Sequence, residues 1–220
     1  MKITHRKYVE DSLKNTGLEC LDLIQLHCPP TEVYYRPEIF ELFDRLKEEG
    51  KIKNLGVSVE KVEEALKAIE FSNVTTVQII YNMFRQRPSE KFFAAAKKKD
   101  VGVIVRVPLA SGLLTGKFSN DTQFNKEYHR FFNREGAAFD KGETFSGIPY
   151  DIGLKAVEEL KAVFPDTENL APIALRWILD APELSCIIPG ASKKEYLNSN
   201  ITAMDLAPLR DDQRTAVDAL

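Results

Sequence analysis

The chain has 220 residues, of which 44% are hydrophobic and 29% charged, and its formal net charge is -3. This is the composition of a soluble globular domain, although closed eight-unit α/β barrels typically need ~250 residues. The slight negative charge excludes the broad basic surface that binds nucleic acid or an anionic membrane, and no apolar run approaches the ~20 residues of a membrane span. The N-terminal MKITHRKYVEDS lacks the apolar stretch of a signal peptide. We therefore expect a cytoplasmic protein whose three cysteines are reduced thiols.

Short apolar runs rich in β-branched residues alternate with amphipathic stretches along the chain. Five such runs predict strands: residues 21–27, 54–59, 74–80, 101–108 and 186–189. Between the first two, PEIFELFDRLKEEG predicts a helix with Pro37 in its first turn and Gly50 at its C-terminal cap. Alternating strands and helices predict parallel pairing through right-handed crossovers. Runs such as VGVIVRVP do not alternate, which predicts a sheet covered on both faces.

The five strand units have no Pro- or Ser-rich linker between them, so we expect a single domain over residues 1–220. Residues 118–150 are the exception to the regular pattern, and a loop of that length in a compact domain is typically functional, for example a lid, or disordered. Five units fit either an open doubly wound sheet or part of a (β/α)₈ barrel. Periodicity does not distinguish these two architectures.

In both architectures ligands gather beyond the carboxyl ends of the strands. The first three strands place His27, Ser58 and Gln78 there, although a lone histidine at a strand end is more often structural. The segment VPLASGLLTGK after the fourth strand is more informative, because small residues, two glycines and a lysine suit a loop whose backbone N–H groups approach a phosphate. It matches neither a P-loop nor a G-x-G-x-x-G fingerprint.

Five blocks of the sequence resemble, in order and spacing, successive blocks of the aldo-keto reductase family, from about Val9 to Leu209. They are VEDSLKNTGLECLDLIQLH, KEEGKIKNLGVS, VQIIYNMFRQR, VPLASGLLTGKF and IIPGASKKEYLNSN. The resemblance implies a (β/α)₈ barrel that binds NADPH or NADH in extended form and reduces carbonyl compounds by hydride transfer. The blocks correspond to the C-terminal part of the family, so we expect a partial barrel of five parallel strands with the first three units absent.

The resemblance also implies roles for individual residues. His27 matches the active-site histidine that orients and polarises the substrate carbonyl, Ser58 and Gln78 match positions that bind the nicotinamide carboxamide, and Arg106 stands where many members place an aromatic ring against the nicotinamide. The positions that match the diphosphate loop and the adenosine-phosphate end are Leu109, Ser111, Gly112 and Lys117, and Gly190, Ser192, Lys193 and Asn200, respectively. Lys193 favours NADPH over NADH, whereas Tyr196 replaces the usual arginine or glutamine. No metal site is implied.

Catalysis in the family uses Asp, Tyr, Lys and His, and of these the chain matches only His27. The resemblance therefore implies an N-terminally truncated oxidoreductase, inactive alone, that would act on a small carbonyl or alcohol chosen chiefly by residues 118–150. A non-catalytic NAD(P)-binding or interaction module is the alternative, and an open doubly wound sheet with another phosphate ligand is a third interpretation. Two open sheet edges would also favour self-association.

Overall fold

A computed structural model describes residues 2–220. Contacts within the chain divide it into two compact units, unit 1 (Met1–Ile79 and Lys91–Val103) and unit 2 (Ile80–Glu90 and Ile104–Leu220). The prediction of one domain over residues 1–220 stays a prediction. Among the described residues, no helix combines the length and the apolar character that a membrane span requires.

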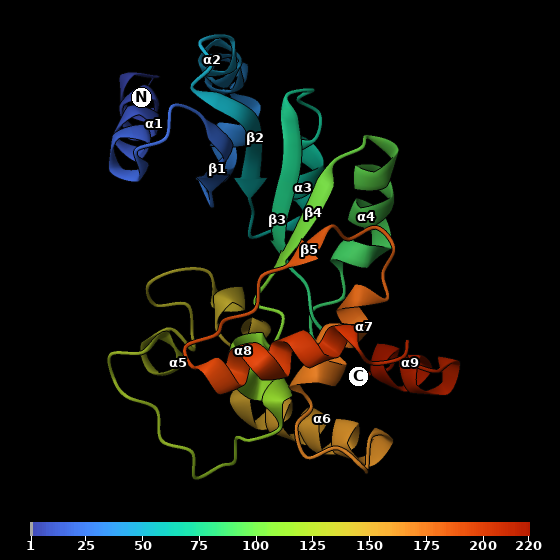
Figure 1. Cartoon of the computed structure of the whole chain (residues 1–220). Helices are drawn as coiled ribbons and strands as arrows, with labels where there is room; N and C mark the ends of the chain where they lie inside the picture. The colour runs from blue at the N-terminus through green and yellow to red at the C-terminus, as the bar shows by residue number, and fades with distance from the viewer. Residues whose placement is uncertain (1) are drawn as a thin grey trace. The chain divides into compact units, whose positions relative to one another are not determined.

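Unit 1 holds the first three strands, except for Ile80 at the end of the third, and their helices, drawn from blue to green in Figure 1. Its elements are α1 (Lys2–Thr16), β1 (Leu21–His27), the 3₁₀ helix η1 (Thr31–Tyr35), α2 (Pro37–Glu48), β2 (Ile52–Ser58), α3 (Val62–Ala68) and β3 (Val74–Ile80). The helix α4 (Pro88–Lys98) and the strand β4 (Gly102–Arg106) each lie partly in unit 1 and partly in unit 2.

The helix α2 shows how closely local sequence signals determine an element of unit 1. Pro37 occupies its first turn, Ile39 and Phe40 are almost fully buried, and Phe40 stacks on Phe71 with ring centroids 3.8 Å apart. Gly50 follows the helix with a left-handed φ of 70°, a conformation that costs glycine little. The prediction of a helix over residues 37–50 is therefore confirmed.

The strands β1, β2 and β3 are parallel and lie in chain order, as predicted. Their side chains alternate between two faces. On one face Leu26, Val57 and Val77 form a buried row, whereas Gln25 and its neighbours make the opposite face polar. Burial in β2 does not alternate, because Leu55, Gly56, Val57 and Ser58 are all buried. The expectation of a sheet covered on both faces stays a prediction.

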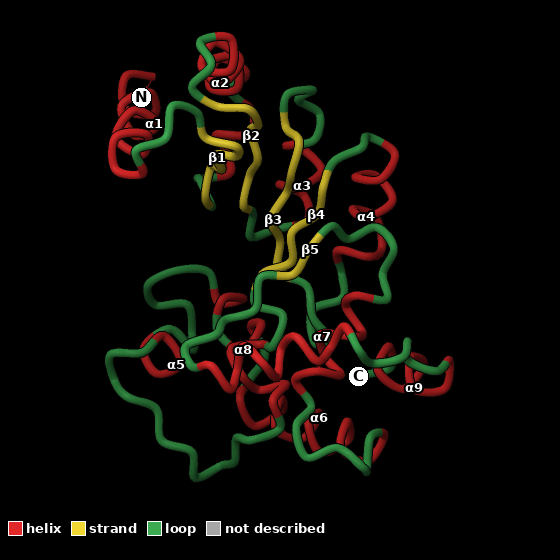
Figure 2. Tube along the Cα trace, viewed as in Figure 1, coloured by secondary structure: helices red, strands yellow, loops and turns green. Residues whose placement is uncertain are grey.

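Unit 2 contains the rest of the chain, and in it β4 pairs in parallel with β5 (Cys186–Ile187). The fifth strand is shorter than the predicted 186–189 range. The other elements are the 3₁₀ helices η2 (Ala110–Thr115), η3 (Lys141–Glu143), η4 (Phe145–Gly147) and η5 (Thr202–Met204), and the helices α5 (His129–Phe132), α6 (Tyr150–Val163), α7 (Ala171–Leu179), α8 (Lys194–Ile201) and α9 (Asp211–Asp218). Figure 2 shows that residues 118–150 consist mostly of loop with short helical turns.

The core of unit 2 is organised around α7. Trp177 of this helix is buried and stacks on Tyr81, with ring centroids 4.9 Å apart. Burial raises the pKa of Tyr81 to about 12. Beyond the end of α7, the carboxylate of Asp180 accepts hydrogen bonds from Arg176 and from the backbone N–H of Leu209, and it also pairs with Arg214. One buried carboxylate thus ties α7 to the chain that enters α9.

Candidate cofactor site

In unit 1 the three predicted strand-end residues form one row. The register pairs His27 with Ser58 and Ser58 with Gln78, so the three side chains lie on the same face of the sheet. Ser58 is fully buried, Gln78 is half-buried and His27 is exposed. Ser58 Oγ lies 3.5 Å from Gln78 Oε1, which makes a long hydrogen bond with the hydroxyl as donor. The row leaves the amide of Gln78 partly accessible and has the exposed imidazole of His27 at one end.

Gln25 contacts this row, although it was not predicted from the sequence to belong to the site. Gln78 Nε2 donates a hydrogen bond of 2.9 Å to Gln25 Oε1. Gln25 precedes His27 by two positions, so both side chains lie on one face of β1. That period-2 spacing was the available signal, but a single glutamine inside an apolar run gives no motif to recognise.

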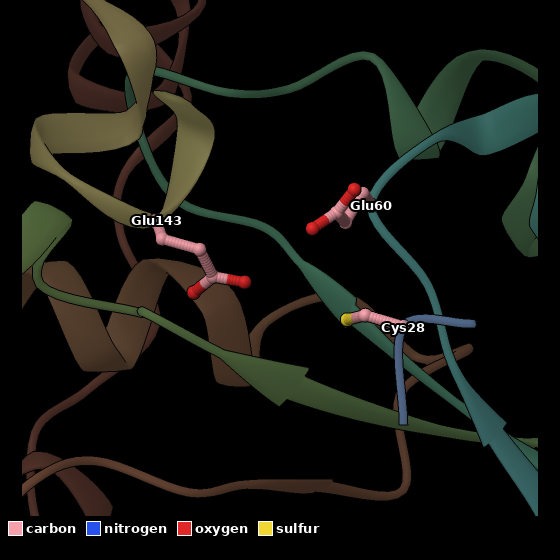
Figure 3. Close-up of side chains that lie close together, drawn as sticks. All are labelled: Cys28, Glu60 and Glu143. Atoms are coloured by element: carbon pink, nitrogen blue, oxygen red, sulfur yellow. The ribbon is translucent and has the colours of Figure 1, made fainter. Parts of the chain in front are cut away.

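The backbone at the carboxyl ends of β1 and β2 is fixed by several hydrogen bonds. Cys28 adopts a left-handed φ of 45°, and its N–H donates to the carbonyl of Ser58, which also accepts from the hydroxyl of Tyr34. Figure 3 shows Cys28 and Glu60 on the chain that follows these two strands. The N–H groups of Glu60 and Lys61 both donate to one oxygen of Glu64. The position of Ser58 is therefore set by the fold before any ligand binds.

In unit 2 the predicted diphosphate loop contains three successive residues with positive φ. Ala110, Ser111 and Gly112 have φ values of 46°, 55° and 102°, and successive residues with unusual backbone angles turn their N–H groups toward one concave side. The loop begins at Leu109, whose carbonyl accepts from the N–H of Gly112. Lys117 is exposed beyond the loop. Binding of a diphosphate by this loop stays a prediction.

Residues 118–150 form hydrogen bonds with that loop. Ser111 Oγ donates to the carbonyl of Glu143 at 2.9 Å and accepts from the N–H of Phe145 at 3.1 Å, while Arg130 donates to the carbonyl of Ser111 at 2.6 Å. A side chain at Gly112 would meet the ring of Phe118 at 2.9 Å. The loop and the 118–150 segment are thus packed as one structure within unit 2.

Arg106 also has a partner in the 118–150 segment. Only 6% of its surface is exposed, and its guanidinium forms an ion pair with Glu143 of η3. Glu143 is labelled in Figure 3. The guanidinium is therefore held by a carboxylate of the 118–150 segment, and it does not lie free to stack on a ring.

The 118–150 segment is held in place by an aromatic cluster consisting of Phe118, Phe124, Phe145 and Tyr150. Phe124 contacts the other three rings at centroid distances of 5.2 to 5.8 Å. The guanidinium of Arg134 lies over Phe124 and Tyr150 at 5.2 and 5.0 Å, where cation–π attraction adds to the packing. The irregular sequence of this segment therefore folds through side-chain contacts and not through periodic structure.

The predicted adenosine end lies at the start of α8 in unit 2. Gly190, Ser192 and Lys193 are exposed, and Asn200 is buried and donates to the carbonyl of Gly190 at 3.2 Å. The Nζ atom of Lys193 lies 5.7 Å from the ring centroid of Tyr196. Asn200 holds the turn, while the exposed Ser192 and Lys193 lie next to a helix N-terminus, which favours anions.

Known proteins match the sequence and the fold of this chain. The family model described as the Aldo/keto reductase family matches residues 2–220, so the match takes in α1 as well as the blocks recognised from Val9 onward. The chain is 26% identical to "Uncharacterized oxidoreductase YqkF" and 29% identical to "Aldo-keto reductase YhdN", both from Bacillus subtilis (strain 168). These matches cover 96% and 90% of this chain, and 64% and 58% of the relatives. It is also 24% identical to "Aldo-keto reductase yakc [NADP(+)]" from Schizosaccharomyces pombe, over 90% of this chain and 56% of that protein.

Solved structures agree with the sequence matches. The glycerol dehydrogenase AKR11B4 from Gluconobacter oxydans superposes with a TM-score of 0.78 at 28% identity, covering 99% of this chain and 63% of that one. The aldo-keto reductase AKR11C1 from Bacillus halodurans, in its holo form, gives a TM-score of 0.75 at 24% identity and shares the fold, covering 99% of this chain and 67% of that one. The chain thus spans less than two thirds of the curated relatives it matches. Its parallel α/β fold agrees with these neighbours, and the chain belongs to the aldo/keto reductase family.

Proposed function

We propose that this chain binds NADP(H) and serves NADPH-dependent reduction of small carbonyl compounds or, in reverse, oxidation of small alcohols. The observation that carries the proposal is the row of His27, Ser58 and Gln78 on one face of unit 1. The bound cofactor would supply a hydride. Ser58 and Gln78 would hold its carboxamide by hydrogen bonds, and exposed His27 would donate a hydrogen bond to the substrate carbonyl oxygen.

In unit 2, two groups of residues would bind the phosphates of the cofactor. The concave loop from Leu109 to Gly112, together with Ser111 Oγ and Lys117, would bind the diphosphate, although the N–H groups of Ala110 and Gly112 already donate to backbone carbonyls. Gly190, Ser192, Lys193 and Asn200 would form the adenosine-phosphate end. Arg106 would lie beside the nicotinamide. Because Ser111 and Arg106 already have partners in the 118–150 segment, these partners must be exchanged when a cofactor binds.

We propose NADP(H) in preference to NAD(H) because the exposed cation of Lys193 suits a phosphate monoester, and a relative carries NADP(+) in its name. Lys193→Met should weaken NADPH binding about tenfold, which corresponds to ~1.4 kcal/mol, and leave NADH binding unchanged. Quenching of protein fluorescence measures both dissociation constants. Lys194→Met, the same change at the next exposed lysine, is the control. An equal loss for both cofactors in Lys193→Met would contradict the assignment.

Turnover tests the catalytic part of the proposal. Hydride transfer to a carbonyl generates an alkoxide that needs a proton donor of matched pKa. The resemblance gives the chain His27 but no match for the family's tyrosine, so we expect the 220-residue polypeptide to bind NADPH without reducing simple aldehydes at ordinary rates. Consumption of NADPH, followed by its absorbance with an aldehyde present, checks this. Turnover at ordinary rates would show that another group protonates the alkoxide.

A further inference from the structure

Three polar side chains of unit 1 form a hydrogen-bonded chain across three strands. Gln78 on β3 uses its two amide atoms differently: Nε2 donates to Gln25 Oε1 on β1 at 2.9 Å, and Oε1 lies 3.5 Å from the hydroxyl of Ser58 on β2. The direction of these bonds determines whether Gln78 presents its N–H₂ group or its carbonyl oxygen to a ligand. Because its N–H₂ group is committed to Gln25, Gln78 presents an acceptor.

The contact between Gln25 and Gln78 depends on Gly56. These two glutamines lie on strands that are not neighbours, with β2 between them. Gly56 is the β2 residue paired with both Gln25 and Thr76, and a Cβ there would overlap Thr76 Oγ1 and lie 3.2 Å from Gln25 Cγ. A glycine at this one position lets the Gln25 side chain pass over β2 and reach β3.

Stability alone does not account for this arrangement. Gln25 Nε2 is buried and has no hydrogen-bond partner among the described residues. A buried donor without a partner costs about 1–3 kcal/mol. A leucine or methionine at position 25 would avoid that cost, so the glutamine is better explained by what its oxygen does to Gln78.

We propose that Gln25 is a positioning residue that orients the Gln78 amide toward the carboxamide of a nicotinamide ring. The inference rests on the proposed function. The carboxamide N–H₂ of the cofactor is a donor, and Gln78 Oε1 is the acceptor that Gln25 leaves facing it. Without Gln25, the Gln78 amide can rotate by half a turn and oppose one donor with another.

The test compares ligands that differ in a single group. NADP⁺ has the carboxamide N–H₂, the 3-acetylpyridine analogue of NADP⁺ has a methyl group in its place, and 2′,5′-ADP lacks the nicotinamide. We expect the unaltered chain to bind NADP⁺ about fivefold more tightly than the analogue, the equivalent of one modest hydrogen bond. In Gln25→Met that preference should fall to about one, while the affinity for 2′,5′-ADP stays within about twofold.

Two further variants separate orientation from a general effect on folding. Gln25→Glu keeps an acceptor for Gln78 Nε2 and should retain the preference for NADP⁺. Gln25→Asn keeps the polarity but is one methylene too short to reach Gln78, so it should behave like Gln25→Met. The inference is wrong if Gln25→Met or Gln25→Asn keeps the preference, if Gln25→Glu loses it, or if all three ligands weaken equally. If the unaltered chain binds none of the three ligands, the proposed function fails and the inference fails with it.

Discussion

The two units hold their candidate site residues in different ways. In unit 1 the residues lie on neighbouring strands, and Ser58, Gln78 and Gln25 bond to one another. In unit 2, Ser111 and Arg106 are bonded to Glu143 of the 118–150 segment, which lies 32 and 37 positions from them in sequence. Strand register therefore prepares the first group for a ligand, whereas the second group needs a long irregular segment to be in place.

The difference has a consequence for binding. A carboxamide can add to the unit 1 row without breaking the bonds between its members, because Gln78 Oε1 can accept a second hydrogen bond. A ligand that uses Ser111 Oγ or the guanidinium of Arg106 must replace bonds that unit 2 already makes. We therefore expect substitutions in the 118–150 segment to disturb the candidate site residues of unit 2. Substitutions that change strand packing should disturb those of unit 1.

The largest expected effect comes from breaking the ion pair between Arg106 and Glu143 in unit 2. Glu143→Gln removes the carboxylate that pairs with the buried guanidinium of Arg106, and loss of one partner of a buried pair costs roughly 3 kcal/mol. The free energy of unfolding from urea titration measures the loss. Hydrogen exchange of residues 118–150 should rise at the same time, because the segment is anchored through this pair.

A matched control for this variant lies in the same segment. Glu135 pairs with Lys141, but 82% of the Glu135 side chain is exposed. Exposed ion pairs contribute about 0–1 kcal/mol, so Glu135→Gln should leave stability and exchange nearly unchanged. Equal effects of the two variants would mean that the Arg106 pair does not anchor the segment.

A smaller loss of stability is expected when a side chain is added at Gly56 in the sheet of unit 1. Gly56→Ala introduces a Cβ that overlaps Thr76 Oγ1 and lies 3.1 Å from the Thr76 carbonyl oxygen, so the strands must shift at a cost of about 2 kcal/mol. Thermal or urea unfolding measures this loss. Gly190→Ala in unit 2 is the control, because nothing lies within 4 Å of a Cβ at that position. A neutral Gly56→Ala would show that the strands adjust freely.

The same comparison explains which parts of the structure could be predicted. The bounds of β1 and β3 agree with residues 21–27 and 74–80, because both are short runs rich in apolar and β-branched residues. β2 begins at Ile52, two residues before the predicted start, because Lys53 is exposed at the sheet and hides the strand pattern. Within unit 1 the row of His27, Ser58 and Gln78 followed from the rule that parallel strands end together.

The contacts of unit 2 could not be predicted in that way. Ser111 and Arg106 were assigned to a cofactor by resemblance, yet their partners Glu143 and Phe145 lie more than thirty positions away in a sequence without periodicity. His129 lies in a polar stretch of the sequence, yet it is half-buried against Thr144. Such contacts depend on side-chain packing between distant segments, for which a single sequence carries no signal.

The smallest expected effect is a loss of stability at low pH that comes from His129 in the 118–150 segment. Burial, followed by the charge of Arg130, lowers the pKa of His129 below its ordinary value of 6.5. The unfolded chain therefore binds the proton more readily than the folded chain, and the stability that neutral His129 contributes is present above pH 6.5 and lost as the pH falls below it. Urea unfolding at pH 7.5 and 5.5 should show a small loss in the unaltered chain. His129→Gln does not titrate and should lose less, and an equal loss in both proteins would assign the pH dependence to other groups.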